Sequence, residues 1–220
     1  MRLLVFGAGG HGRVVAELLQ DAGHELAGFI DRSADLLVGG DDPRTIIDEK
    51  LFWGEVAGGR LPVDADFVIP AIGDNETRIR VGNALGAFCA PGVVHPRAVV
   101  SRTARIEAGT VVLAGACINA SARVGRCAIV NTGAIIEHDC VIGDGAHISP
   151  GAVLAGGVTV ASRAWIGANA TLIPGVRIGD RTIVGAGAVV LRDVANDEVV
   201  VGNPARSIVQ ASPSLRSEGD

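Results

Sequence analysis

The sequence predicts two domains of different classes. We expect a small Rossmann-like α/β domain with a parallel sheet over residues 1–92, a parallel β-helix over residues 93–208 and a polar tail over residues 209–220. A six-residue repeat runs without interruption from Val93 to Val194, strand and helix patterns alternate before it, and the composition changes between the two parts. Short repeats of fixed length are typical of solenoid folds.

The first domain reads as alternating strands and helices. Residues 2–6 (RLLVF) form an apolar run typical of a buried strand, and residues 13–22 carry apolar side chains at helical spacing. Further strands are expected over residues 25–30 and 66–72, followed by a helix over residues 76–85. Because strands and helices alternate, the sheet should be parallel, with ligands bound beyond the carboxyl ends of its strands.

A glycine-rich loop, Gly7-Ala8-Gly9-Gly10-His11-Gly12, joins the first strand to the first helix. Such a loop can hold a phosphate on backbone N–H groups, or it can be a tight turn needed only for packing. His11 either caps the phosphate or is simply exposed. Asp31 ends the second strand, where an acid often meets a ribose. A domain of about ninety residues provides half of a dinucleotide site, which favours a mononucleotide or a nucleotide sugar, with a nicotinamide-dependent reductase as an alternative.

The repeat predicts the direction of each side chain in the second domain. In all seventeen hexads the second residue is Val, Ile or Leu, and the sixth is Ala, Cys, Thr or Val. Side chains alternate along a strand, so positions 6 and 2 should point inward and position 1 outward. Position 5 is Gly in eight hexads and Asn, Asp or Ser in four more, which suits a corner with positive φ. Three strands make an eighteen-residue coil, and five to six coils make a rod about 25–30 Å long.

Composition excludes several classes of protein. The net charge is −5 and the pI about 5.5, with no basic run, which disfavours nucleic-acid binding. No stretch approaches eighteen apolar residues, so we expect a soluble cytoplasmic protein without a membrane segment. Cys89, Cys117, Cys127 and Cys140 show no CxxC spacing. Cys140 holds an inward position and should be a reduced packing thiol; a catalytic Cys140 beside His138 would need to face a substrate.

His138 is the strongest candidate for chemistry on the rod. It lies at a corner of the hexad IIEHDC, between Glu137 and Asp139, and the equivalent residue one coil later is Gly156. An imidazole oriented by a carboxylate is typical of a general base, and an unobstructed backbone N–H can stabilise an oxyanion. The alternative is a solvated surface histidine.

His147 occupies an outward position, and Trp165, eighteen residues later, should stack over it. A zinc site would need converging ligands, but His95, His138 and His147 fall at hexad positions 3, 4 and 1, respectively. These positions face different directions, so we expect no metal site.

Five segments together resemble one family. They are GAGGHG after the first strand, AIGDNETR after the third, the hexapeptide repeat, NTGAIIEHDC followed by HISPGA, and VGNPAR. The chain resembles the bacterial nucleotide-sugar acetyltransferases over nearly its full length, to about residue 208. This family includes the N-acetyltransferases of nucleotide-linked 4-amino-4,6-dideoxy sugars of bacillosamine and perosamine pathways, which serve polysaccharide biosynthesis, and the sialic acid O-acetyltransferase-like proteins. The resemblance implies a left-handed β-helix, a homotrimer with active sites between adjacent rods, and acetyl-CoA as co-substrate.

The resemblance also implies roles for individual residues. His138 would be the base, Asp139 its first-choice partner with Glu137 as second choice, and the Gly156 amide the oxyanion donor. Residues implied in acetyl-CoA binding are His147, Gly156, Ala168, Ala186, Gly202, Pro204 and Arg206, and the alternative role of His147 is to position the acceptor. Residues implied in nucleotide-sugar binding are Gly9, Gly10, His11, Gly12, Asp31, Arg32, Gly73, Asn75 and Asn131.

The function expected from the resemblance is acetyl transfer from acetyl-CoA to the amino group of a nucleotide-linked 4-amino-4,6-dideoxy sugar. Two alternatives stay open. One is O-acetylation of a sugar hydroxyl by the same base, and the other is a non-catalytic trimer that binds a nucleotide sugar. The sequence specifies neither the sugar nor the nucleotide.

Overall fold

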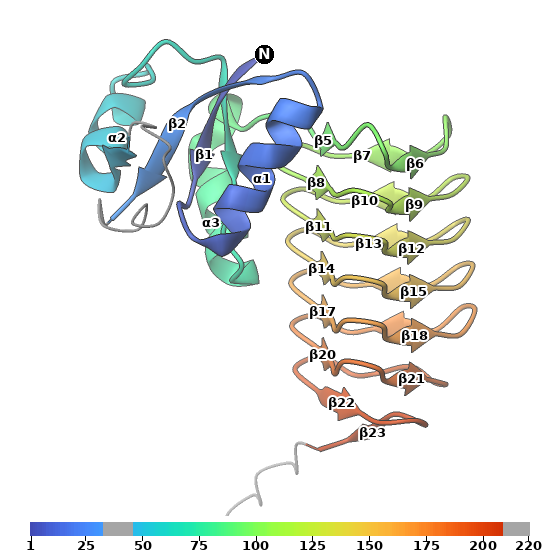
Figure 1. Ribbon diagram of the computed structural model, residues 1–220. Coiled ribbons are helices and arrows are strands. Elements are labelled where there is room, and N and C mark those ends of the chain that lie inside the picture. Colours follow the sequence, from blue (N-terminus) through green and yellow to red (C-terminus); the bar gives the residue numbers. More distant parts are fainter. Residues whose placement is uncertain (33–45, 209–220) are drawn as a thin grey trace, which may run out of the picture.

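The computed structural model describes residues 1–32 and 46–208 as an α/β domain lying beside a rod (Figure 1). The polar tail expected over residues 209–220 lies outside the described residues. No helix within the described ranges is long and apolar enough to cross a membrane.

The α/β domain has a four-stranded parallel sheet in the order β3-β2-β1-β4. Its strands are β1 (Arg2–Phe6), β2 (Glu25–Asp31), β3 (Ile46–Asp48) and β4 (Phe67–Pro70), and its helices are α1 (Gly10–Asp21), α2 (Glu49–Ala57) and α3 (Asn75–Leu85), followed by a 3-10 turn over Gly86–Phe88. The three expected strands and the parallel sheet are confirmed, whereas β3 and α2 were not expected.

Helix α1 begins at Gly10, three residues before the expected start, because the glycine-rich loop itself enters the helix. Glycine at position 12 is needed for this close approach, since a Cβ there would overlap the Gly7 carbonyl oxygen. Side-chain caps fix the other two helices. Asp48 accepts hydrogen bonds from Lys50 N and Leu51 N at the start of α2, and Asp74 accepts one from Thr77 N in α3.

The sheet is buried on both faces. On one face, Leu3 and Val5 of β1 pack with α1 and with side chains of the rod, and on the other face Leu4 and Phe6 pack with α2 and α3. Helix α1 therefore lies between the sheet and the rod, as Figure 1 also shows. The rod's outward residues Val93, Val111 and Ile129 are buried in this junction.

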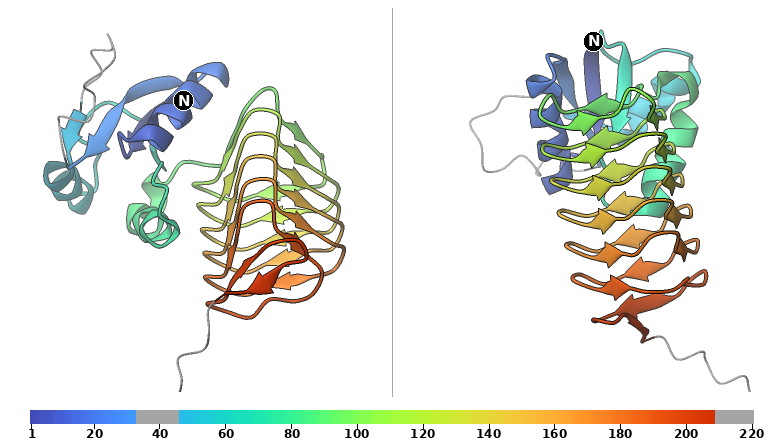
Figure 2. Two further views of the ribbon diagram at one scale, coloured as in Figure 1. Left: turned by 60° about the horizontal axis from the view of Figure 1, so that its bottom comes forward. Right: turned by 90° about the vertical axis from the view of Figure 1, so that its right-hand side faces the viewer.

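The rod is a left-handed parallel β-helix with three faces, each a parallel sheet (Figures 1 and 2). The first face holds β5 (Val93–Val94), β8 (Val111–Val112), β11 (Ile129–Val130), β14 (His147–Ile148), β17 (Trp165–Ile166), β20 (Ile183–Val184) and β22 (Val199–Val201), with β23 (Arg206–Ser207) antiparallel to β22 at its end. The second face holds β6 (Val99–Val100), β9 (Cys117–Ile118), β12 (Ile135–Ile136), β15 (Val153–Leu154), β18 (Thr171–Leu172) and β21 (Val189–Val190). The third face holds β7 (Arg105–Ile106), β10 (Arg123–Val124), β13 (Val141–Ile142), β16 (Thr159–Val160) and β19 (Arg177–Ile178).

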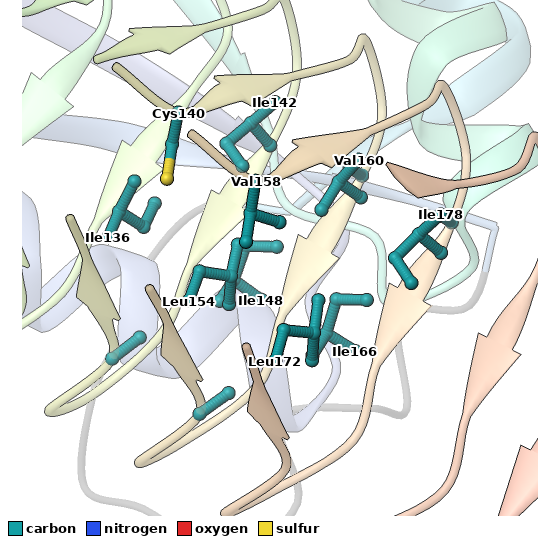
Figure 3. Close-up of a cluster of buried hydrophobic side chains, with 14 of the residues drawn as sticks. Ile136, Cys140, Ile142, Ile148, Leu154, Val158, Val160, Ile166, Leu172 and Ile178 are labelled. Atoms are coloured by element: carbon teal, nitrogen blue, oxygen red, sulfur yellow. The ribbon is translucent and has the colours of Figure 1, made fainter. Parts of the chain in front are cut away.

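The inward positions of the repeat form one continuous aliphatic core, part of which Figure 3 shows. The second residue is buried in fourteen of the seventeen hexads, and the remaining three, all in the first coil, pack against the core from its end. Cys140 is confirmed as a buried free thiol, with Sγ donating to the Ala155 carbonyl oxygen at 3.2 Å. Because its sulfur points into this core, a nucleophilic role for Cys140 is wrong.

The corners follow the expected backbone geometry. All eight glycines at position 5 have positive φ. Asp139, beside His138, has a φ of 62° at the same position. Arg163 (φ 61°) and Arg181 (φ 54°) also have positive φ at position 5, although arginine does not favour this conformation. Stacking of the coils thus imposes the corner conformation even where the side chain disfavours it.

Candidate active site

His138 lies at the corner between β12 and β13, on the edge where the second and third faces of the rod meet. Its Nδ1 is 2.9 Å from Asp139 Oδ2, and both side chains are exposed. The described contacts of His138 include none with Glu137, so the structure favours Asp139 as the residue that orients the ring. Because Nδ1 faces a carboxylate, the neutral ring carries its proton there and leaves Nε2 as the basic nitrogen.

Gly156 lies directly against the free side of this imidazole. A Cβ built on Gly156 would be 2.6 Å from both Nε2 and Cε1 of His138, so any other residue there would displace the ring. The Gly157 amide donates to the His138 carbonyl oxygen at 2.9 Å and fixes the two coils in register. The Gly156 amide donates to no described residue and remains available to a ligand.

His147 on β14 forms a second cluster, on the first face. Its Nε2 is 3.0 Å from Asn131 Nδ2, and because an amide nitrogen can only donate, the imidazole accepts and is neutral. The ring of Trp165 stacks on it with centroids 5.9 Å apart and planes at 2°, as expected. Burial, followed by the positive charge of Arg78 and the neighbouring His11, lowers the pKa of His147 to about 3. Proximity to His11 places this cluster at the start of α1.

The start of α1 is open to a ligand. Gly9 is the N-cap and provides no side chain to the first-turn amides, and a Cβ on Gly9 or Gly10 would meet nothing within 4 Å. His11 Nε2 is buried and has no partner among the described residues, so the alternative of a simply exposed His11 is wrong. Burial and then Arg78 lower the pKa of His11 to about 4. Unpaired amides at a helix N-terminus are suited to a phosphate.

A cavity of about 560 Å³ lies beyond the carboxyl ends of β1, β2 and β4, where the fold predicts a ligand. Asp31 and Arg32 line it, and their part in nucleotide binding stays a prediction. Asp31 accepts from Ala8 N at 2.8 Å, and Arg32 Nε donates to Glu49 Oε2 at 2.6 Å. Glu49 and Trp53 of α2 complete the wall and were missed by sequence reasoning. The sequence signal for this helix is the N-cap residue Asp48 followed by the aromatic pair Phe52 and Trp53.

Gly73 and Asn75 line a different, smaller hollow of about 300 Å³ between α3 and the rod, together with Trp165. The Asn75 amide nitrogen donates to the carbonyl oxygens of Arg163 and Ala164, and its oxygen accepts from Arg78. The Asn75 side chain is therefore committed to holding the two domains together. Its part in nucleotide-sugar binding stays a prediction.

The residues expected to bind acetyl-CoA follow another edge. Ala168 and Ala186 lie one coil apart where the first and second faces meet, and the Gly187 amide donates to the Ala168 carbonyl oxygen at 2.8 Å. Gly202, Pro204 and Arg206 form and follow the turn between β22 and β23. Asn131 lies on this same edge, and His147 lies on the first face beside it. Within one chain, His138 and Gly156 lie on a different edge, between the second and third faces. No group of three or more possible metal-ligating side chains is found among the described residues.

Comparisons with known proteins identify the family. Residues 2–85 match the model of the PglD N-terminal domain, and residues 121–156 and 157–192 match the bacterial transferase hexapeptide repeats. PerB from Caulobacter crescentus, solved in complex with CoA and GDP-perosamine, is 38% identical with a TM-score of 0.85 over 94% of this chain and 97% of that chain. The chain belongs to the hexapeptide-repeat nucleotide-sugar N-acetyltransferases.

Other members of this N-acetyltransferase family agree. The acetyltransferase domain of PglB from Neisseria gonorrhoeae, solved with acetyl coenzyme A, is 34% identical with a TM-score of 0.83 over 94% of this chain and 98% of that chain. A UDP-N-acetylbacillosamine N-acetyltransferase of Bacillus subtilis (strain 168) is 38% identical over 118 residues, which is half of this chain and half of that protein. The fold and family expected from the sequence are confirmed.

Proposed function

We propose that this protein transfers the acetyl group of acetyl-CoA to the amino group of a nucleotide-linked 4-amino-4,6-dideoxy sugar. Relatives that match nearly the whole chain were solved with CoA and GDP-perosamine or with acetyl coenzyme A, which supports both substrates. The observation that carries the proposal is the arrangement at the corner of β12 and β13. There the His138 ring is held by Asp139 on one side and opens on the other toward Gly156.

His138 acts as the general base. The neutral amine of the sugar attacks the thioester carbonyl carbon, and Nε2 takes the proton that the nitrogen loses as the new C–N bond forms. Asp139 stabilises the imidazolium that results. The C–S bond then breaks, and the thiolate of CoA leaves with the proton returned by His138, which restores the neutral imidazole.

Gly156 provides the electrostatic contribution. The tetrahedral intermediate carries its negative charge on the former thioester oxygen, and the unpaired Gly156 amide stabilises it by a hydrogen bond. The glycine has two tasks, because its missing side chain also leaves room for the His138 ring.

The α/β domain holds the acceptor. The base and ribose occupy the 560 Å³ cavity with Asp31 and Arg32, and the diphosphate lies at the start of α1 on the amides that follow Gly9. From there the sugar extends toward His147 and Asn131 on the rod. Anchoring the nucleotide far from the reacting nitrogen lets binding energy orient the amine for attack.

A homotrimer completes the site. In one chain the edge with His138 and the edge with Ala168 border the second face, whose outward residues are small or apolar: Val99, Cys117, Ile135, Val153, Thr171 and Val189. A threefold arrangement that turns this face inward buries it and brings the His138 edge of one protomer against the Ala168 edge of the next. The pantetheine of acetyl-CoA lies in the groove between them.

Replacement of the base tests the mechanism. His138→Ala should lower kcat by about 10²–10⁴ while the KM for acetyl-CoA stays nearly unchanged. Thiol release from acetyl-CoA, measured with a panel of UDP-, GDP- and dTDP-linked 4-amino sugars and their 4-hydroxy counterparts, identifies the acceptor. Turnover near the wild-type value in His138→Ala would refute the base, and a preference for the hydroxyl acceptors would refute N-acetylation.

Mixed trimers test the shared site. His138 lies on the edge between the second and third faces, and His147 lies on the first face. Chains of His138→Ala and His147→Ala that are co-expressed should therefore form some sites in which the His138 of one protomer and the His147 of its neighbour are both intact. We expect measurable recovery of activity in mixed trimers relative to either variant alone. Absence of recovery in trimers shown by mass to be mixed would contradict a site between protomers.

A further inference from the structure

Arg78 in α3 is fully buried, although arginine is rarely so, and it lies where the α/β domain meets the rod. Its guanidinium uses all five of its N–H groups. Nε donates to the Cys127 carbonyl oxygen at 2.7 Å, Nη1 to Ile72 and Gly73 carbonyl oxygens at 2.8 and 3.1 Å, and Nη2 to Asn75 Oδ1 at 2.7 Å and the Gly145 carbonyl oxygen at 2.8 Å. One side chain thus joins α3, the loop after β4 and two corners of the rod.

Among the described residues, no carboxylate forms an ion pair with Arg78. In the described part of the chain no Asp or Glu lies within ion-pair distance of it, whereas Arg2, Arg32, Arg163 and Arg181 all form ion pairs. Every hydrogen-bond acceptor around the Arg78 guanidinium is a neutral carbonyl or amide oxygen. Asp74, at the start of α3, attracts the charge from beyond ion-pair distance and offsets it only in part. A buried cation without a contacting counter-ion is costly, so the site favours an incoming anion.

The contacts of Arg78 border each part of the proposed acceptor site. The Gly145 carbonyl that it holds lies two residues before His147, and the Ile72 carbonyl belongs to a residue that lines the 560 Å³ cavity. Its charge also reaches His11 and His147, because it contributes, after burial, to the lowered pKa of both. The same charge would attract an anion at the start of α1.

We propose that Arg78 is a positioning residue for the acceptor: its guanidinium fixes the nucleotide-binding loops against the coil that carries His147, and its charge, which no contacting carboxylate neutralises, draws the nucleotide diphosphate to the N-terminus of α1. This inference rests on the proposed function, because it assumes an acceptor that spans the junction. Arg78 touches neither reacting atom. It acts through the loops that it holds and through its field.

Two variants separate the charge from the hydrogen bonds. Arg78→Lys keeps the charge and loses the planar fork, and Arg78→Gln loses both the charge and most of the bonds. We expect the KM for the nucleotide sugar to rise about 10-fold in Arg78→Lys and about 100-fold in Arg78→Gln, with the KM for acetyl-CoA changed less than about two-fold. The matched control is Arg123→Gln, which removes an exposed charge on the third face and should change neither KM.

Binding without turnover keeps this inference distinct from the proposed function. Titration calorimetry of the intact oligomer with UDP and GDP should show the same loss of affinity in the Arg78 variants, whether or not any acceptor is acetylated. A wild-type protein that binds these nucleotides and acetylates no 4-amino sugar would refute the function and leave the inference standing. Equal changes in the KM for both substrates, or none, would refute the inference.

The imidazoles of His11 and His147 report on the field of Arg78, which adds to the larger effect of burial on both pKa values. The groups that face Arg78 are His11 from α1, His147 from β14, Asp74 at the start of α3 and the Cys127 thiol of the rod. By NMR, His11 and His147 should stay neutral at pH 5.5 in the wild type and in Arg78→Lys, and both should titrate at higher pH in Arg78→Gln. If Arg78→Gln does not fold, the first two proteins decide, because a protonated His11 or His147 at pH 5.5 in either overturns the assignment.

Discussion

The rod and the α/β domain place their functional groups by different rules. In the rod every sixth residue repeats its environment, so a side chain is informative where it departs from the repeat. The outward residues of the first face run Val93, Val111 and Ile129 beneath the domain and then change to His147 and Trp165. In the domain no residue repeats another, and the polar groups gather where strands end. Functional residues in the rod are therefore found where the sequence departs from the repeat, and those in the α/β domain are found at the ends of its strands.

The largest expected effect concerns how far damage spreads in each part. Ile166 is fully buried in the rod core and Phe52 in the core beneath α2. Replacement of either by Ala should lower the free energy of unfolding by about 2–5 kcal/mol. Because a solenoid coil contacts only its neighbours, hydrogen exchange should increase in coils next to Ile166 and fade with distance, whereas Phe52→Ala should affect the whole α/β domain. If Ile166→Ala lowered hydrogen-exchange protection equally in all coils of the rod, the rod would unfold as one unit like the α/β domain, and this difference between the two parts would be refuted.

Next in size is an effect on catalysis alone. Gly156→Ala places a methyl group where the His138 ring lies, so the ring must move away from the proposed oxyanion site. We expect kcat to fall by about 10²-fold, equivalent to about 2.7 kcal/mol of transition-state stabilisation, with little change in the unfolding transition. Steady-state kinetics and thermal unfolding on the same preparation check this. An unchanged kcat would show that the glycine only serves the corner.

This contrast explains how much could be predicted from the sequence. The rod's core, corners and the His138 site follow from position in the hexad, since each side chain direction is set by its number in the repeat. Position in a repeat gives no information about α2, which is a short helix packed on a sheet without a sequence repeat. Glu49 and Trp53 were therefore missed. Position in a repeat also gives no information about Asn75 and Arg78, because their partners, such as the Gly145 carbonyl, come from another domain. Contacts across the junction have no local signature.

Acidification should weaken the junction in particular. The folded pKa values of His147 and His11, about 3 and about 4, lie below the ordinary value of 6.5. The unfolded chain therefore binds more protons between pH 6.5 and these values, and stability falls as the pH falls through that window. We expect a loss of about 1 kcal/mol for each imidazole between pH 6.5 and 5.5.

Urea unfolding at the two pH values measures this slope, and His147→Gln and His11→Gln serve as matched controls. Each control removes one imidazole while other titrating groups stay the same. Each variant should show a change in the free energy of unfolding between the two pH values that is about 1 kcal/mol smaller than in the wild type. A slope that is identical in the wild type and both variants would mean that the imidazoles protonate in the folded protein.

The smallest effect distinguishes a free helix surface from the junction itself. Gly54 in α2 and Gly82 in α3 are both helical glycines, but a Cβ on Gly54 would meet nothing within 4 Å, whereas one on Gly82 would overlap the Cys127 sulfur of the rod. Gly54→Ala should raise the free energy of unfolding by about 0.5–1 kcal/mol through helix propensity, and Gly82→Ala should lower it because the sulfur must move. Thermal unfolding of the two variants gives the sign directly. Stabilisation by both would mean that α3 can move away from the rod without cost, which the buried Arg78 at the same contact forbids.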